Sequence, residues 1–274
     1  MRGLLASPLG FAIGFALGAL GGGGSILAVP ALVYAAGQTA SDATTTSLLV
    51  VAGASAFGLV GHWRAGRVRW ASGGVFGLVG IGGSILGTVI NRRLDDDALL
   101  AAFAALVLVA AWRMVTACPS CTRVGEADAV TETPNGGDVR LLTHSAPLTM
   151  DQLIVAVLAG TAVGFLTGLF GVGGGFVIVP ALTLALGFSM PHAVGTSLLV
   201  ITINALVALV ARGGPGAVEW SVALPFVIAA FGGVSAGVRA ADRLPARSLL
   251  RWFAALLVAV ALFTGGQAAA GLAA

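Results

Sequence analysis

The sequence predicts an all-α polytopic membrane protein built from two repeated halves. Three observations carry this prediction: the composition, the length of the apolar runs and a repeat at one fixed offset. Of the 274 residues, 58% are hydrophobic and 9% are charged, whereas about a quarter of the residues of a soluble globular chain are charged. So few charges cannot solvate a water-exposed surface of this size, and the lipid bilayer is therefore expected to surround most of the chain.

The basic residues fit a membrane protein better than a nucleic-acid-binding protein. All 14 are arginines, and they stand in short clusters between apolar runs, a placement typical of the loops that orient membrane proteins. The glycine runs are not nucleotide-binding loops, because no Lys-Ser or Lys-Thr follows them. We find no catalytic constellation and no metal-ligand set, so the sequence predicts no enzyme, no cofactor and no nucleic-acid partner.

Apolar runs long enough to cross a membrane occur eight times. They cover residues 8–36, 44–63, 71–90, 98–115, 152–186, 195–211, 220–238 and 248–265. The polar segment 116–149 separates the first four runs from the last four, and its Cys118 and Cys121 are expected to be incidental loop thiols. We therefore divide the chain into a first transmembrane repeat, 1–115, a linker expected in the cytoplasm, 116–149, and a second transmembrane repeat, 150–274.

The two halves match without gaps at an offset of 150 residues. The matches are Gly14-Phe15 with Gly164-Phe165, Gly18 with Gly168, Gly21 with Gly171, Val29–Leu32 with Val179–Leu182, and Thr46–Val50 with Thr196–Val200. Apolar matches arise by chance in membrane sequences, but glycine, proline and Thr-Ser matches at one fixed offset do not. The pattern indicates a duplication, and internal repeats are characteristic of secondary transporters.

Each half opens with a run that is too long and too broken for one helix. Gly21–Ser25 and Gly171–Gly175 interrupt these runs, and glycine destabilises a helix interior by about 1 kcal/mol per residue. Each run is therefore expected to form a Gly-broken or re-entrant helix pair, followed by three transmembrane helices. A re-entrant pair gives three crossings per half and inverted halves; a single crossing gives four per half and parallel halves. If both half-helices of each opening run span the membrane, each half has five crossings, and its loops lie on the same sides as with a re-entrant pair.

The arginines favour the inverted arrangement. Parallel halves would leave six arginines on one side of the membrane and eight on the other. Inverted halves leave four on one side and ten on the other, as the positive-inside rule requires. The ten are Arg64, Arg67, Arg69, Arg113, Arg123, Arg140, Arg239, Arg243, Arg247 and Arg251.

These paired motifs resemble those of the sulfite exporter TauE/SafE family of membrane transporters. The Gly-rich element, the Pro-Ala-Leu after it and the Thr-Ser-Leu-Leu-Val element occur in both halves, as in that family. The resemblance covers nearly the whole chain except 116–149. It implies a multi-pass protein of the bacterial cytoplasmic (inner) membrane that carries a small anionic solute, such as sulfite, sulfoacetate or a related sulfonate or carboxylate, by alternating access.

The Gly-rich breaks are the first candidates for an anion site. A break exposes backbone N–H groups, and the half-helix that follows presents the positive end of its dipole. The candidate residues are Gly22, Gly23, Gly24 and Ser25 in the first half, and Gly173, Gly174 and Gly175 in the second. The alternative is that these glycines only let helices pack closely.

Hydroxyl and amide side chains form the second candidate group. They are Thr45, Thr46 and Ser47, Thr196 and Ser197, and Asn204. The hydroxyls are expected at helix starts, where they either cap the helix or donate to an anion beside the break. Asn204 either bonds a neighbouring helix or lines the pathway.

Coupling and assembly stay open at this point. No carboxylate lies deep in a span, and His62 and His192 fall at segment ends, where a solvated or interfacial histidine is expected. An anion channel and a structural membrane subunit are the alternatives to a carrier. A homodimer is compatible with the sequence, although nothing in it demands one.

Overall fold

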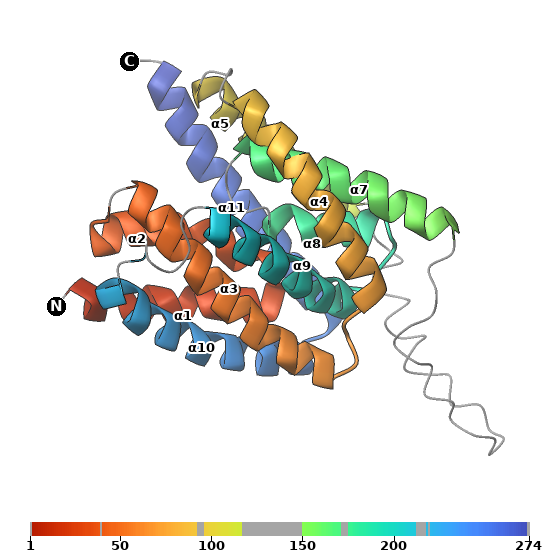
Figure 1. The fold of residues 1–274 in the computed structure, drawn as a ribbon, viewed down its shortest axis with the longest axis horizontal. Coiled ribbons are helices and arrows are strands. Elements are labelled where there is room, and N and C mark those ends of the chain that lie inside the picture. Colours follow the sequence, from red (N-terminus) through yellow and green to blue (C-terminus); the bar gives the residue numbers. More distant parts are fainter. Residues whose placement is uncertain are drawn as a thin grey trace.

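The computed structural model describes residues 2–38, 40–91, 96–116, 150–170, 175–211, 218 and 220–272, and every element in these ranges is helical (Figure 1). The predicted linker and its two cysteines lie outside the described residues, apart from Thr116 at the end of a helix.

The helices follow the predicted apolar runs closely. The first half contains α1 (Arg2–Leu20), the 3-10 turn η1 (Gly22–Gly24), α2 (Ser25–Ala36), α3 (Ala40–Arg64), α4 (Trp70–Asn91) and α5 (Asp96–Thr116). The second half contains α7 (Met150–Phe170), α8 (Gly175–Leu184), α9 (Met190–Ala211), α10 (Trp220–Arg243) and α11 (Ala246–Leu272). The predicted interruption of the first run is confirmed, since α1 ends at Leu20 and α2 begins at Ser25.

Four stretches of the described helices are long and apolar enough to cross a membrane. They are Asp42–Arg64, Trp70–Gly87, Met190–Val210 and Val222–Ala241. Shorter apolar stretches lie in α1, α5, α7 and α8: Pro8–Leu20, Ala102–Arg113, Leu153–Leu169 and Gly175–Leu184.

Helix α1 packs along α10 through a row of glycines at every fourth residue. A Cβ atom on Gly14 or Gly18 would collide with the backbone of Ala230 or Val234, and one on Gly10 would lie 2.9 Å from the carbonyl oxygen of Phe226. Because residues four apart share one helix face, these glycines let two helix backbones touch directly.

Helix α7 packs along α4 in the same way. The backbone of Gly164 meets that of Gly80, and Gly168 meets Ser84. From the other side, Gly83 and Gly87 of α4 are closed off by the backbone of α7. The first helix of each half, α1 or α7, thus packs mainly against the fourth helix of the other half, α10 or α4. It packs less against its own neighbours in sequence.

The contacts also fix the directions of six helices. Residue numbers rise together along α1 and α10, along α3 and α10, along α4 and α7, and along α4 and α9, so the helices of each pair are parallel. They rise in opposite senses along α3 and α9, where Gly58 faces Leu198 and Ser55 faces Thr202. Two sets of parallel helices result, with α1, α3 and α10 running against α4, α7 and α9 (Figure 1).

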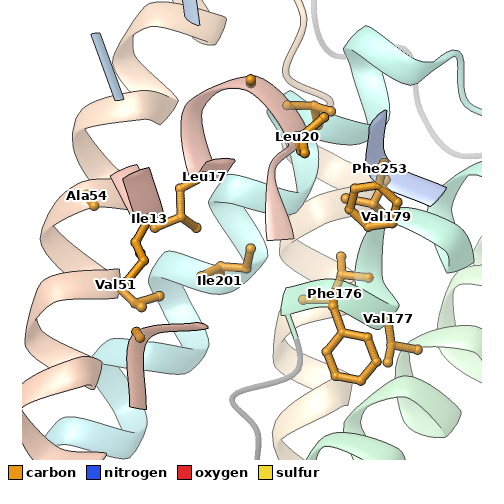
Figure 2. Close-up of a cluster of buried hydrophobic side chains, with 14 of the residues drawn as sticks. Ile13, Leu17, Leu20, Val51, Ala54, Phe176, Val177, Val179, Ile201 and Phe253 are labelled. Carbon is orange, nitrogen blue, oxygen red and sulfur yellow. The ribbon is translucent and has the colours of Figure 1, made fainter. Parts of the chain in front are cut away.

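A buried apolar core joins both halves. Figure 2 shows side chains of α1, α3, α8, α9 and α11 converging, among them Leu17, Val51, Phe176, Ile201 and Phe253. Each of these five residues is buried. The interrupted segment and the start of α8 are therefore enclosed by apolar side chains of both halves.

Candidate functional site

The first Gly-rich break is a tight, buried turn. Gly21 has φ 73° and ψ −111°, a backbone conformation that glycine adopts readily because it has no Cβ atom. Gly22–Gly24 form the 3-10 turn, and the Ser25 hydroxyl donates to the Gly22 carbonyl over 2.8 Å. All five residues are buried, so the chain reverses inside the protein at this point.

The second break meets the first. Its Gly173 and Gly174 lie outside the described residues, but Gly175 begins α8. A Cβ atom on Gly22 would collide with the carbonyl group of Gly175, and one on Gly175 would lie 2.5 Å from Ser25 Oγ. The start of α8 therefore touches the turn that leads into α2, and the two helix N-termini lie side by side.

The break of the first half also lies against α9 of the second. A Cβ atom on Gly21 would be 2.5 Å from Ser197 Oγ and 3.3 Å from Val194 Cα. The structure thus brings Gly22, Ser25, Gly175 and Ser197 into one cluster. Gly21 belongs to this cluster too, although it was not among the predicted site residues. Its pairing with Gly171 at the 150-residue offset was a usable signal.

The expected position of the hydroxyls at helix starts is wrong, and this removes the capping alternative. Helices α3 and α9 begin at Ala40 and Met190, so Thr45, Thr46, Ser47, Thr196 and Ser197 lie one to two turns inside them. Ser47 and Ser197 instead donate to carbonyls three residues earlier, those of Thr44 and Val194, each over 2.8 Å. All five hydroxyl residues are buried, and the donor proton of Ser197 must turn away from Val194 before it can reach a solute.

Thr196 connects the α3–α4 loop to this region. Its Oγ1 accepts a hydrogen bond from the backbone N–H of Arg69 over 3.2 Å. Thr46, its counterpart at the offset, is fully buried, and its Oγ1 has no hydrogen-bond partner within the described part of the chain. A buried unpaired hydroxyl costs about 1–3 kcal/mol, a cost that a hydrogen bond to a polar solute would remove.

Asn204 does not form the predicted helix–helix bond through its carbonyl oxygen. Oδ1 is buried and lacks a partner in the described ranges. The hydroxyls of Ser55 and Thr202, 2.9 Å apart, join α3 to α9 instead. The pathway role of Asn204 therefore stays a prediction.

Not every candidate glycine faces the meeting point of the two breaks. A Cβ atom on Gly24 would collide with the Ile13 carbonyl of α1 and lie 2.6 Å from Leu17 Cγ. One on Gly23 would lie 2.7 Å from Leu256 Cδ2. Gly24 thus has the close-packing role that was the alternative to anion binding, and only its backbone N–H group remains a candidate for contact with an anion.

Of the two positions expected for His62, solvated or interfacial, the solvated one is wrong. His62 is 1% exposed, because the end of α3 is covered by α1, by α9 and by the α3–α4 loop. His192 is half-buried, and its Nδ1 lies 2.8 Å from Ser189 Oγ. Nothing in the hydropathy pattern distinguishes a covered helix end from an exposed one.

The electrostatics of the cluster favour negative charge. Helices α2 and α8 both begin here, and each helix N-terminus carries a partial charge of about +0.5. No Asp or Glu is buried among the residues whose exposure the structure describes. In the same ranges there is no group of three or more His, Cys, Asp or Glu side chains that could hold a metal ion. The site offers N–H and O–H donors without a competing carboxylate.

Comparisons with known proteins agree with these features. The family profile described as "Sulfite exporter TauE/SafE" matches residues 6–264. A "probable membrane transporter protein" of Xylella fastidiosa is 34% identical over 92% of the chain and 90% of its own length. Similar proteins with the same description are YunE of Bacillus subtilis, 30% identical over 84% and 83%, and one of Haemophilus influenzae, 27% identical over 94% and 96%. No solved structure matches the chain.

Proposed function

This chain belongs to the sulfite exporter TauE/SafE family of multi-pass membrane transporters, and we propose that it moves a small organosulfur or organic anion across the cytoplasmic membrane by alternating access. Sulfite, sulfoacetate and similar sulfonates or carboxylates are the proposed solute class. The family is one of transporters, not of enzymes, so the site is expected to bind a solute and release it unchanged.

The observation that carries the proposal is the meeting of Gly22 with Gly175 beside Ser197. Non-helical backbone inside a membrane protein is tolerated only where it is buried in protein or lines a wet cavity. Discontinuous helices of secondary transporters point their N-terminal ends at anionic groups of the solute. Two such ends in contact, with hydroxyls within reach and no buried carboxylate among the residues whose exposure is described, support a site for an oxyanion.

The packing supports two halves related by duplication. Gly10, Gly14 and Gly18 lie against residues 226, 230 and 234; Gly160, Gly164 and Gly168 lie against residues 76, 80 and 84. Each contact of one set becomes a contact of the other when 150 is added to the residue of the first half and subtracted from that of the second. The proposed repeats are 1–115 and 150–274, with the linker 116–149 between them.

The helix directions support inversion of the halves. Helices α1, α3 and α4 run opposite to their counterparts α7, α9 and α10 at the offset. In a membrane, this relation corresponds to a pseudo-twofold axis in the membrane plane. In this proposal the α3–α4 loop, the linker and the α10–α11 connection lie on one side, which is the arginine-rich side and hence the proposed cytoplasmic side.

Cysteine labelling is expected to separate the inverted arrangement from the parallel one. The background protein has Cys118 and Cys121 replaced by serine. In it, the thiols introduced by Ala65→Cys and Leu244→Cys should both react only with a thiol reagent that reaches the cytoplasm. The thiol introduced by Gly37→Cys, in the α2–α3 connection, should react with a membrane-impermeant thiol reagent added outside the cell. If Ala65→Cys and Leu244→Cys label from opposite sides, the halves are not inverted.

Binding of small anions is expected to stabilise the purified protein selectively. The panel contains sulfite, thiosulfate, sulfoacetate, taurine, sulfate, acetate and lactate, each at a series of concentrations. A ligand at 100 times its Kd stabilises the folded state by about 2.7 kcal/mol, which a thermal denaturation curve resolves. Stabilisation by a cation or a neutral solute, with none by any anion, would overturn the anion site.

Flux measurements then separate a carrier from a channel. The described cluster is closed off from solvent, since Ser25, Thr196 and Ser197 are buried, and this supports an occluded carrier. Saturable flux and stimulation by solute on the opposite side are expected in proteoliposomes that contain the anion selected by the panel. Single-channel currents would assign the same site to a channel.

A further inference from the structure

His62 is the one buried titratable side chain among the residues whose exposure the structure describes. Nothing in the proposed anion site uses it. Histidine is also the side chain whose ordinary pKa, about 6.5, lies closest to physiological pH. A group of this kind inside a transporter requires an explanation, because ionisable residues within membrane proteins commonly lie on ion or solute pathways.

The position of His62 links it to the break. Its Nε2 lies 3.2 Å from the carbonyl oxygen of Gly18, in the last turn of α1 and three residues before Gly21. Because a carbonyl oxygen only accepts hydrogen bonds, Nε2 carries a proton in this contact. Both the neutral ring and the imidazolium satisfy it.

The backbone of His62 connects to the other half as well. A Cβ atom on Gly195 would lie 3.2 Å from His62 Cβ, and Gly195 directly precedes Thr196 and Ser197. The His62 carbonyl accepts the Arg67 N–H over 2.9 Å. His62 therefore packs between the helix that ends at the first break and the helix turn that carries the candidate hydroxyls.

Several charged or titratable groups belong to the elements around His62. The end of α3 and the α3–α4 loop carry three arginines, of which Arg67 is half-buried and the other two are exposed, and Asp42 lies exposed at the far end of α3. Helix α9 carries the half-buried His192, and α1 carries only Arg2, at its far end. Helix α10 carries the exposed Arg239 and Arg243, and also Asp242, whose side chain is not described. Arg67, whose backbone N–H donates to the His62 carbonyl, is the charged residue with a described contact to His62.

We propose that His62 is the proton-binding group that couples anion binding at the Gly21–Ser25 break to pH. The inference rests on the proposed anion-transport function and deepens it. A buried imidazolium is stable only with a compensating negative charge, and an anion at the break supplies one. Anion and proton therefore bind cooperatively, and by linkage each raises the affinity for the other by the same factor.

The test measures the Kd of sulfoacetate by calorimetry at about pH 6 and about pH 8, on either side of the ordinary histidine pKa of about 6.5. Sulfoacetate keeps both negative charges over this range, so the solute itself does not titrate. Wild-type protein is expected to bind it roughly five- to 100-fold more tightly at the lower pH, because coupled sites usually differ about five- to 150-fold in affinity and one bound proton changes an affinity at most about tenfold per pH unit. His62→Gln, which can still donate to Gly18, should bring the ratio of the two Kd values close to one. His192→Gln, the matched control, should keep the wild-type ratio.

The outcomes separate this inference from the proposed function. Binding of sulfoacetate with the same pH ratio in wild type and His62→Gln overturns the coupling role alone. Absence of binding of any panel anion at either pH overturns the anion site and the coupling role together. If His62→Gln fails to fold, the wild-type protein still tests the proposal. Addition of the anion to a weakly buffered wild-type sample near pH 7 should be accompanied by proton uptake, which raises the pH of the solution. An unchanged pH overturns the proposal.

Discussion

The Gly83→Val variant is expected to lose the folded state, whereas Gly82→Val, one residue away on the same helix, is expected to keep it. A Cβ atom on Gly83 would collide with the Thr161 carbonyl and lie 2.8 Å from the Phe165 nitrogen of α7, while one on Gly82 would meet nothing within 4 Å. Overpacking typically costs about 1–3 kcal/mol. Here the cost should reach the upper end or exceed it, because the obstacle is backbone that cannot change rotamer.

The pair isolates the α4–α7 contact, since both substitutions change the intrinsic helix propensity by the same amount. Thermal denaturation and size-exclusion profiles in detergent compare the two variants with wild type. We expect Gly233→Val to match Gly83→Val, because Gly233 is closed off by the Phe11 backbone of α1. Similar stability of Gly82→Val and Gly83→Val would show that the close approach of α4 and α7 is not essential to the fold.

Gly22→Ala is expected to weaken anion binding about tenfold or more, equivalent to a loss of about 1.4 kcal/mol or more of binding free energy. The added methyl group would occupy the position of the Gly175 carbonyl, so the two helix N-termini must move apart. Gly23→Ala is the matched control, because the methyl group there meets only the end of the Leu256 side chain, which can rotate. The Kd of the anion selected by the panel is the measurement.

Ser197→Ala provides a second test of the same cluster, since it removes a hydroxyl without adding volume. A reduction in affinity is expected there too. The unfolding temperature should change little, because among the described residues the Ser197 hydroxyl donates a hydrogen bond only to the Val194 carbonyl of its own helix. Wild-type affinity in both Gly22→Ala and Ser197→Ala would remove the meeting point of the two breaks from consideration as the anion site. Gly24 is less suited to this test, since any side chain there disturbs α1 first.

The helices could be predicted from the sequence because lipid selects for continuous apolar runs, and the interruption at Gly21–Gly24 followed from helix propensity. Helix starts were less accurate. Residues 40–43 and 190–194 extend α3 and α9 beyond their predicted apolar runs, and this shifts the candidate hydroxyls from the cap into the helix. Polar residues such as Ser41 and Asp42 continue a helix without contributing to the hydropathy that marked it.

The partners of the helices could not be read from hydropathy. Lipid tails are as apolar as leucine, so apolarity does not specify which helices associate. The four-residue spacing of Gly10, Gly14 and Gly18 indicates a close-packed face, but it does not identify α10 as the partner. The shared offset, which relates Gly83 to Gly233, marks glycine faces on α4 and α10 but does not specify which helix each face contacts. The burial of His62 likewise depends on packing between segments far apart in the chain.

The pairing of α1 with α10 has a consequence for synthesis of the chain. At a translation rate of about 5–20 residues per second, roughly 10 to 40 seconds separate the emergence of α1 from that of its partner, so α1 must wait in the membrane or the insertion machinery with its glycine face uncovered. The α4–α7 contact, by contrast, can form as soon as α7 is made. Chains truncated before α10 keep the glycine face of α1 uncovered. We therefore expect quality-control proteases to degrade these chains faster than complete chains.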